Sequence, residues 1–333
     1  MEVEEILIPL SKVIEEYNKT HKVPVKWFEA ITALAIIYFA NKKCDLAVIE
    51  AGLGGLNDCT NIINGKINVI GNIGYDHVDI LGNDILQIAK HKAGIIKKNS
   101  DTVILEQDKI MNVFEEQCKN VNSKLHVIKK ESLENYSFDS DLQRFSFKGY
   151  KDIEVNLKGK SQIYNAAEVL EAIDILKKDG YNIDNKAIYE GLKTVVHRAR
   201  LETLSKNPLI IFDGGHNENA IKNLEQNISM YYPKNKTVYI VSILKTKDYK
   251  TIIKNICKDK NSIFYFTSGI DKRYVSKENL YKEAKKYIDK EKIFKEDIKK
   301  ALNNCKEEYK DRVILIVGSF YVYKTVVEEL KND

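Results

Sequence analysis

A carboxylate, an imidazole and a lysine follow two short apolar runs in the first third of the sequence. Glu50 comes directly after residues 46–49 and leads into the glycine-rich residues 52–55. Asp76 and His77 follow the second run, residues 67–70, and Lys92 comes later in the next helical segment. Carboxylates and imidazoles bind metals, and a lysine binds phosphate as a point charge. This pattern indicates a metal and phosphate site. A tight glycine turn and a solvated Asp-His pair are the alternative explanation.

A second set of polar residues occupies the later part of the chain. Asn165 lies in the stretch 159–166, Arg200 precedes Leu201 and Glu202, and residues 213–217 contain Asp213 and His216. Each has a purely structural alternative. Asn165 could cap a helix, Asp213 could end a strand and cap the next helix, and Arg200 could pair with Glu202 or Asp213.

The elements that position these residues alternate between strand and helix. A helical period covers residues 3–17, with Pro9 as a kink or a late start, and residues 27–41 are apolar on nearly all sides, which predicts a buried helix. Short β-branched runs separated by helical segments predict βαβ units and a parallel sheet. The strands expected here are residues 46–49, 67–70, 102–105 and 125–128, with a helix at 108–121.

The pattern changes after residue 142. Residues 143–157 alternate apolar and polar side chains around Lys148-Gly149, as a hairpin does. Helical periods return at 165–177 and 185–193, and a second strand–helix series follows Pro208. Its expected strands are residues 209–212, 237–241, 262–266 and 313–317. We therefore expect two α/β domains, 1–205 and 206–333.

Composition describes an ordinary soluble protein. The net charge is +5, from 53 basic and 48 acidic side chains, and the lysines form no block, so nucleic-acid binding is disfavoured. Five widely spaced cysteines contain no CxxC pair, which argues against a zinc site and a disulfide framework. The acidic start is unlike a signal peptide, and the longest apolar stretch is too short to span a bilayer. We expect a cytoplasmic protein with no membrane partner.

Six ordered motifs resemble the folylpolyglutamate synthase and dihydrofolate synthase family, a branch of the Mur ligases. The family's glycine-rich loop matches residues 50–61, and its Asn-Ile-Gly-x-Asp-His-x-x-x-Leu-Gly run matches residues 72–82, with Gly71 where threonine is usual. Lys-Ala-Gly-Ile, Gln-x-x-Asn-Ala, Arg-Leu-Glu and Asp-Gly-Ala-His-Asn are matched at residues 92–95, 162–166, 200–202 and 213–217. Gly-Ser-x-Tyr is matched at 318–321.

This resemblance implies a truncated Mur-ligase-like central domain of the P-loop type, followed by a Rossmann-like domain. It implies an ATP-dependent ligase that joins L-glutamate to a folate, dihydropteroate or tetrahydrofolate, through an acyl phosphate. Glu50 and His77 would bind Mg²⁺, Lys92 would be carbamylated and join them, and K⁺ is a further candidate ion. Asn165, Arg200 and Asp213 would contact the nucleotide. Lys92, His216 and Asp213 are the candidate catalytic residues.

The family's phosphate-binding loop, GxxxxGK[ST], is not found. Gly65-Lys66 and Gly159-Lys160 lack its spacing. We therefore expect a fragment or a short form, a weak ATPase, and an exposed sheet edge where the first strands belong. Family members are monomers, but this edge would favour association. A binding or regulatory subunit is the alternative function. A third hypothesis is a Mur-type ligase that acts on a different carboxylate. Only assays with different substrates distinguish it from a folate ligase. Leu56, Asn57, Ser161, Ala199 and Glu218 also depart from the family pattern.

Overall fold

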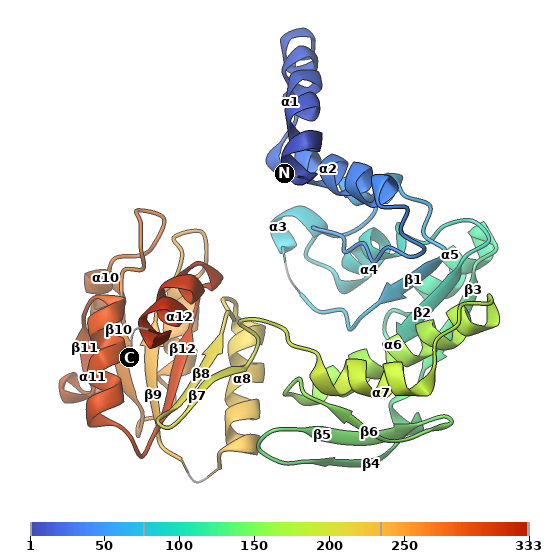
Figure 1. The fold of residues 1–333 in the computed structure, drawn as a ribbon. Coiled ribbons are helices and arrows are strands. Elements are labelled where there is room, and N and C mark those ends of the chain that lie inside the picture. The colour runs from blue at the N-terminus through green and yellow to red at the C-terminus, as the bar shows by residue number, and fades with distance from the viewer. Residues whose placement is uncertain (1, 76, 234, 332–333) are drawn as a thin grey trace. The chain divides into compact units, whose positions relative to one another are not determined.

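The computed structural model describes residues 2–75, 77–233 and 235–331, and these form two compact units (Figure 1). The first unit contains the chain up to Ser132 together with Ala167–Ile183. The second contains Leu133–Ala166 and the chain from Asp184 onward. Both units combine helices with a parallel sheet, which confirms the expected fold class. The expected domain division at residue 205 stays a prediction.

The first unit begins with two helices, α1 (Glu2–Thr20) and α2 (Trp27–Asn41). Pro9 lies inside α1 without ending it. The predicted burial of α2 is wrong, because Thr32 is its one buried residue and Trp27 is 80% exposed. The reason is that α2 contacts α1 and the short 3₁₀ turn η1 (Cys59–Ile62) instead of lying between two layers.

The predicted strand at residues 46–49 is also absent from the described structure. These residues have an irregular backbone, and the side chain of Val48 is 88% exposed. A strand forms only when a neighbour supplies backbone hydrogen bonds. In the described part of the chain β1 pairs with β2 alone, so residues 46–49 have no partner strand.

The sheet of the first unit has three parallel strands in the order β1 (Ile67–Ile70), β2 (Asp101–Leu105) and β3 (Lys124–Ile128). Helices α4 (Ile85–Ala93) and α5 (Met111–Val121) share an apolar core with it. The short helix α3 (Val78–Leu81) adds Leu81 to this core. These elements confirm the predicted strands at 67–70, 102–105 and 125–128, and the predicted helix at 108–121 is α5.

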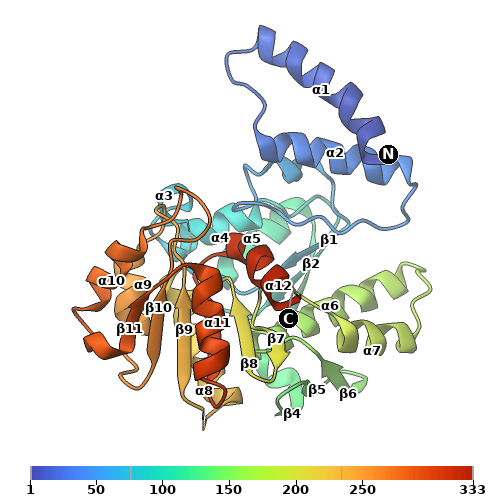
Figure 2. The ribbon, with the colours of Figure 1, turned by 60° about the vertical axis from the view of Figure 1, so that its left-hand side comes forward.

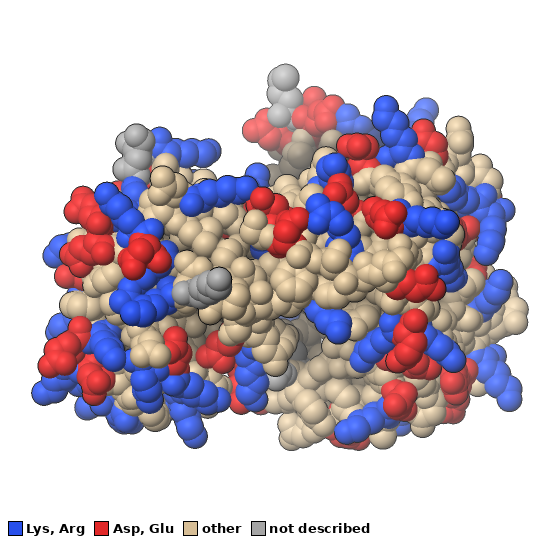
Figure 3. All heavy atoms as spheres, turned by 90° about the horizontal axis from the view of Figure 1, so that it is seen from below, with Lys and Arg blue, Asp and Glu red and all other residues tan. Residues whose placement is uncertain are grey.

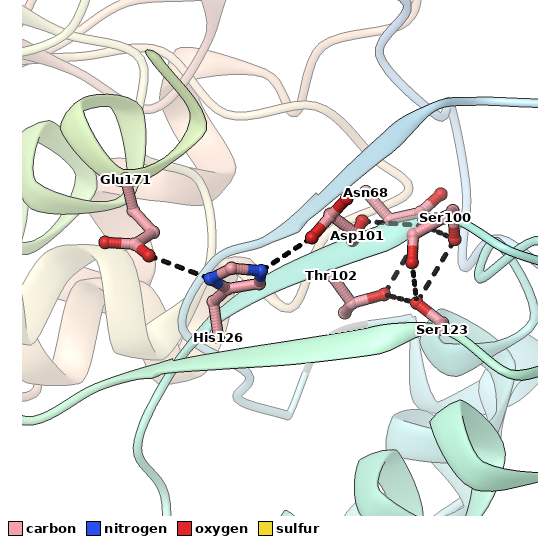
Figure 4. Close-up of polar contacts among 7 residues, drawn as sticks. All are labelled: Asn68, Ser100, Asp101, Thr102, Ser123, His126 and Glu171. Carbon is pink, nitrogen blue, oxygen red and sulfur yellow. Dashed lines mark hydrogen bonds and ion pairs between the residues drawn. The ribbon is translucent and has the colours of Figure 1, made fainter. Parts of the chain in front are cut away.

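Helix α6 (Lys160–Lys178) is attached to this sheet by polar contacts (Figure 4). The imidazole of His126 on β3 lies between two carboxylates, with Nε2 2.6 Å from Oδ1 of Asp101 and Nδ1 2.9 Å from Oε1 of Glu171 on α6. The neighbouring polar cluster, Asn68, Ser100, Thr102 and Ser123, satisfies its own hydrogen bonds within the sheet.

The second unit starts with an antiparallel sheet of β4 (Leu133–Phe138), β5 (Gln143–Phe147) and β6 (Tyr150–Val155), followed by α7 (Asn185–Thr194). The predicted hairpin at 143–157 is β5 and β6, and it is confirmed. The helix predicted at 165–177 begins five residues earlier, at Lys160, and β4 was not predicted.

The main sheet of the second unit has six strands in the order β11-β10-β9-β12-β8-β7. Five strands are parallel and β7 pairs with β8 in antiparallel fashion. The strands are β7 (Glu202–Lys206), β8 (Leu209–Asp213), β9 (Thr237–Val241), β10 (Ile263–Phe266), β11 (Ile293–Lys295) and β12 (Val313–Val317). All four predicted strands are confirmed, whereas β7 and β11 were missed.

Helices cover both faces of this sheet, as a parallel sheet requires. The alternate residues Tyr239 and Val241 face α8 (Glu218–Tyr231), α9 (Tyr249–Ile256) and α10 (Lys277–Ala284). Val238 and Ile240 face α11 (Ile298–Glu308) and α12 (Tyr323–Lys331), which lie in front of the sheet in Figure 2. This arrangement places the C-terminal ends of the parallel strands on the same side of the sheet. Ligands of open α/β sheets usually bind there.

In the described chain, no helix has the length and apolar composition needed to cross a membrane. On the face drawn in Figure 3, basic and acidic side chains alternate over the surface. The five cysteines are all free thiols.

Candidate functional site

The glycine-rich loop of the first unit is held by one carboxylate. Asp58 accepts hydrogen bonds from the backbone N–H of Leu53 at 2.8 Å and from the backbone N–H and hydroxyl of Thr60 at 3.0 and 2.6 Å. Burial alone would raise the pKa of Asp58, but these hydrogen bonds, with another from the Gly52 amide, lower the pKa below its usual value. The loop therefore contains a fixed, ionised aspartate.

Two glycines of this loop fit closely against the helices that follow. A Cβ on Gly54 would lie 2.7 Å from the side chain of Leu81 in α3, and a Cβ on Gly55 would lie 2.9 Å from the carbonyl oxygen of His91 in α4. The N–H of Leu56 donates to that same carbonyl at 2.7 Å. The structure thus brings together the glycine loop, α3 and the end of α4.

The three predicted metal-site residues lie around this junction. Glu50 is exposed and precedes the loop. His77 is exposed, has a left-handed backbone (φ 48°) and is the N-cap of α3. Lys92 is partly buried in the last turn of α4. Asp76 lies outside the described residues.

The donor set of this junction is small. Among the described side chains, no group of three or more histidines, cysteines, aspartates and glutamates is placed to hold a metal ion. Mg²⁺ is usually bound by one or two carboxylates, several waters and the phosphates of its substrate. One carboxylate, Glu50, with one imidazole, His77, is compatible with that mode of binding and not with an all-protein cage.

A buried carboxylate that the sequence did not reveal lies at the C-terminal ends of β1 and β2. Glu168 of α6 is 3% exposed, and its Oε1 accepts the N–H of Leu105 at 3.0 Å. A Cβ on Gly71 would lie 3.8 Å from its Oε2. Burial raises the pKa of Glu168 to about 7, although the hydrogen bond from Leu105 acts in the other direction. Glu168 was missed because its position in α6 fits an ordinary helical pattern.

In the second unit, the predicted residues gather around one aromatic ring. The guanidinium of Arg200 lies 4.6 Å from the ring centre of Phe320, and the ring of His216 meets Phe320 edge-on at 5.9 Å. A Cβ on Gly214 would lie 2.2 Å from the same ring, so only glycine fits there. Sequence reasoning missed Phe320, which is the variable residue of its motif.

Asp213 fixes the backbone around Arg200. One carboxylate oxygen accepts the N–H of Leu201 at 2.9 Å and the other accepts the N–H of Gly215 at 2.8 Å. The N–H of Gly214 donates to the carbonyl of Ala199 at 2.8 Å. Burial raises the pKa of Asp213, against the opposing effects of these hydrogen bonds and of the charges on Arg200 and His216.

The structural alternatives for these residues are met only in part, because Asp213 does end strand β8. Asn165 lies inside α6 and does not cap it, and its amide donates to Gln162. Asn217, not Asp213, caps α8. Glu202 pairs with Arg198, at 2.6 Å, and not with Arg200. The roles predicted for Asn165, Arg200, Asp213 and His216 are therefore still open and remain predictions.

Comparison with known proteins agrees with this arrangement. Residues 10–173 match the family model described as the Mur ligase middle domain, and residues 197–329 match the dihydrofolate synthetase C-terminal domain. A dihydrofolate synthase/folylpolyglutamate synthase of Bacillus subtilis is 29% identical over 331 residues, covering 96% of this chain and 75% of the relative.

Two further relatives support the same assignment. Folylpolyglutamate synthase of Lacticaseibacillus casei is 30% identical over 310 residues, which cover 91% of this chain and 71% of that protein. The crystal structure of folylpolyglutamate synthase from Thermotoga maritima superimposes with a TM-score of 0.85 at 26% identity, covering 99% of this chain and 76% of that one. The chain belongs to the folylpolyglutamate synthase and dihydrofolate synthase family of the Mur ligases.

Proposed function

We propose that the protein is an ATP-dependent ligase that adds L-glutamate to a folate. The observation that carries the proposal is the Asp213–Arg200–Phe320–His216 arrangement at the ends of β8 and β12, on a chain that belongs to this family. Ligands of open α/β sheets bind at that position. A guanidinium held over a ring and beside a fixed loop is suited to phosphate oxygens.

The proposed reaction has two steps. A carboxylate oxygen of the folate attacks the terminal phosphorus of ATP, ADP leaves, and an acyl phosphate forms. The amine of glutamate then attacks the acyl carbon, phosphate leaves, and the amine loses a proton. Such transfers depend on positioning and on neutralising charge. Arg200 would contact phosphate oxygens and Asp213 the ribose. Asn165 would be a further nucleotide contact, and His216 would lie beside the transferred phosphoryl group.

Glu50 and His77 are the residues that would hold Mg²⁺. When bound, Mg²⁺ neutralises negative charge on the phosphates. Lys92, in the turn that contacts the glycine loop, would add a carboxylate if it were carbamylated, and as an ammonium it would instead attract phosphate. We also propose that the protein is cytoplasmic and that it associates with further copies of itself.

A ligation assay tests the proposal. The protein is incubated with Mg·ATP, L-glutamate and either tetrahydrofolate or dihydropteroate, and the products are identified by mass spectrometry. We expect slow formation of a product that carries one more glutamyl residue, dependent on ATP and reduced by Arg200→Ala. Lys151→Ala, an exposed lysine of β6, is the control. No product above the protein-free reaction would contradict the proposal.

Among the described residues, the edge of β1 opposite β2 has no partner strand, and this favours a second function. Val69 on β1 is 43% exposed and Val48, in the irregular segment before it, is 88% exposed, so apolar side chains of this unit are open to another chain. The protein would then serve as a binding or regulatory subunit. Analytical ultracentrifugation separates the two functions, because a concentration-independent monomer argues against the subunit.

A further inference from the structure

The second unit contains a cavity of about 540 Å³ between the loop that precedes α6 and strand β7. Its wall includes Lys158 from the loop and Thr203 from β7. The volume lies in the range of about 300–1,000 Å³ that is typical of small-molecule sites. It is much larger than a single inorganic ion needs, so the cavity suits an organic ligand.

The loop that carries Lys158 is rigidly held. The buried side chain of Gln143 donates to the carbonyls of Leu157 and Gly159 at 2.6 and 3.0 Å. The N–H of Gly159 donates to the hydroxyl of Tyr231 at 3.1 Å. Gly159 has a positive φ of 103° and a Cβ there would lie 3.1 Å from Asn227, so glycine is required. The position of Lys158 is thus fixed by the fold.

The ammonium of Lys158 has hydroxyl partners but no carboxylate. It donates to Oγ1 of Thr203 at 2.7 Å and to the hydroxyl of Tyr232 at 3.0 Å. Among the residues the structure describes, none forms an ion pair with it. A lysine ammonium has three N–H donors, so one remains for a ligand. A partly buried charge without a counter-ion attracts an anion more strongly than an exposed one does.

The two carboxylates of the cavity wall are already neutralised. Arg198 pairs with Glu202 at 2.6 Å, and Lys206 pairs with Asp141 at 2.8 Å. Lys158 and Arg200 are the further cationic residues of the wall, and because Arg200 is assigned to the phosphates of the nucleotide, Lys158 is the cation left for a second ligand. The remaining field is positive and favours an anionic ligand.

The cationic groups are spread along the cavity instead of being clustered. Arg198 lies before the start of β7 and Lys206 lies at its end, and a five-residue strand at about 3.3 Å per residue spans roughly 13 Å. The amide of Gly159, a donor that a compact phosphate would use, is taken by Tyr231. Because Arg198 and Lys206 already pair with Glu202 and Asp141, only an extended ligand that reaches both ends of β7 would meet these cations in addition to Lys158.

We propose that this cavity binds an extended organic polycarboxylate and that Lys158 anchors one of its carboxylates. The identity of that ligand as the γ-glutamyl tail of a folate rests on the proposed function, in which each cycle adds one carboxylate to the tail. Lys158 is thus a substrate-binding residue that holds the γ-glutamyl residues already present on the folate.

Isothermal titration with tri-γ-L-glutamate tests this site without requiring turnover. The wild-type protein binds the peptide, Lys158→Met weakens binding about tenfold or more, and Lys158→Arg restores most of it, because a charged hydrogen bond is lost and regained. Lys151→Met, which removes an exposed lysine outside the cavity wall, leaves binding unchanged. Raising the ionic strength from about 0.1 M to about 1 M weakens wild-type binding.

Three results would overturn the proposal. They are no binding of the peptide, equal binding by the wild type and Lys158→Met, and displacement of the peptide by ADP, which would assign the cavity to the nucleotide. If a thermal melt shows that Lys158→Met is unfolded, the chemical-shift changes that the peptide causes in NMR spectra of the wild-type protein decide. Shifts at residues 156–158 and 203 support the site, and shifts only elsewhere refute it.

The outcome is separable from the proposed function. Peptide binding without any ligation would leave the site standing and contradict the ligase. Ligation of a folate without peptide binding would support the ligase and remove the site.

Discussion

At the scale of single residues, backbone strain next to Arg200 is the clearest cost in the second unit. Ala199 has a φ of 58° and Leu201 a φ of 44°, both in the left-handed region. This conformation costs a non-glycine residue about 1–2 kcal/mol. The strain surrounds Arg200 and is held by the hydrogen bonds to Asp213 and Gly214.

Ala199→Gly should therefore stabilise the protein. We expect the free energy of unfolding to rise by about 1 kcal/mol, because glycine adopts this conformation without steric cost. Urea denaturation of the variant and the wild type measures the change. Ala220→Gly, within helix α8, is the control and should destabilise. Equal or lower stability of Ala199→Gly would show that position 199 is not strained.

Glu168 should make stability depend on pH. Its pKa is raised from 4.5 to about 7 by burial, so between these values the folded chain holds a proton that the unfolded chain has lost. Stability from this group is therefore complete below pH 4.5 and is lost as the pH rises through 7. Glu168→Gln should remove this loss and gain about 2–3 kcal/mol at pH 8, with little effect at pH 4.

Thermal or urea unfolding at both pH values measures the effect of Glu168→Gln. Glu131→Gln, at an exposed carboxylate, is the matched control and should change neither value. If the stability of Glu168→Gln depended on pH as that of the wild type does, the pKa of Glu168 would not be raised in the folded protein.

At the scale of elements, the sequence predicted most of the strands and helices whose patterns are local. The β-branched runs of β1, β2, β9 and β12 needed only their own residues to be recognised. The strand at 46–49 failed because a strand depends on a partner, and the burial of α2 failed because burial depends on what packs against it. The edge strand β7 and the short β11 carry too weak a pattern.

The candidate site shows the same division. The sequence identified the residues that stand in motifs, such as Arg200, Asp213 and His216, because their order along the chain is informative. Phe320 and Glu168 could not be found in this way, since their importance comes from what they contact in the folded chain. Phe320 is the variable position of the motif at 318–321, and Glu168 lies outside every matched motif.

A substitution that adds one methyl group tests the contact between the glycine loop and α4. Gly55 has a positive φ of 153°, and a Cβ would lie 2.7 Å from Ile95 and 2.9 Å from the His91 carbonyl. Gly55→Ala should cost about 1–3 kcal/mol of stability and displace the helix end that carries Lys92. Gly74→Ala, whose Cβ would contact nothing within 4 Å, is the control. Thermal melts of both variants decide, and equal melting temperatures would contradict the packing.

At the scale of the whole molecule, the site residues are divided between two units. Glu50, His77 and Lys92 lie in the first unit, whereas Asn165, Arg200, Asp213 and His216 lie in the second. An acyl-phosphate ligase needs a metal and phosphate site together with nucleotide contacts. The proposed function therefore predicts that substitutions in either set weaken the binding of Mg·ATP.

Isothermal titration of Mg·ATP and of a folate is the most direct test of this central claim. We predict that the wild-type protein binds both ligands, that Glu50→Ala weakens Mg·ATP binding by removing a metal ligand, and that Arg200→Ala weakens it by removing a phosphate contact. Lys151→Ala should bind as the wild type does. No binding of either ligand by the wild type, or nucleotide binding unaffected by Glu50→Ala and Arg200→Ala, would contradict the account.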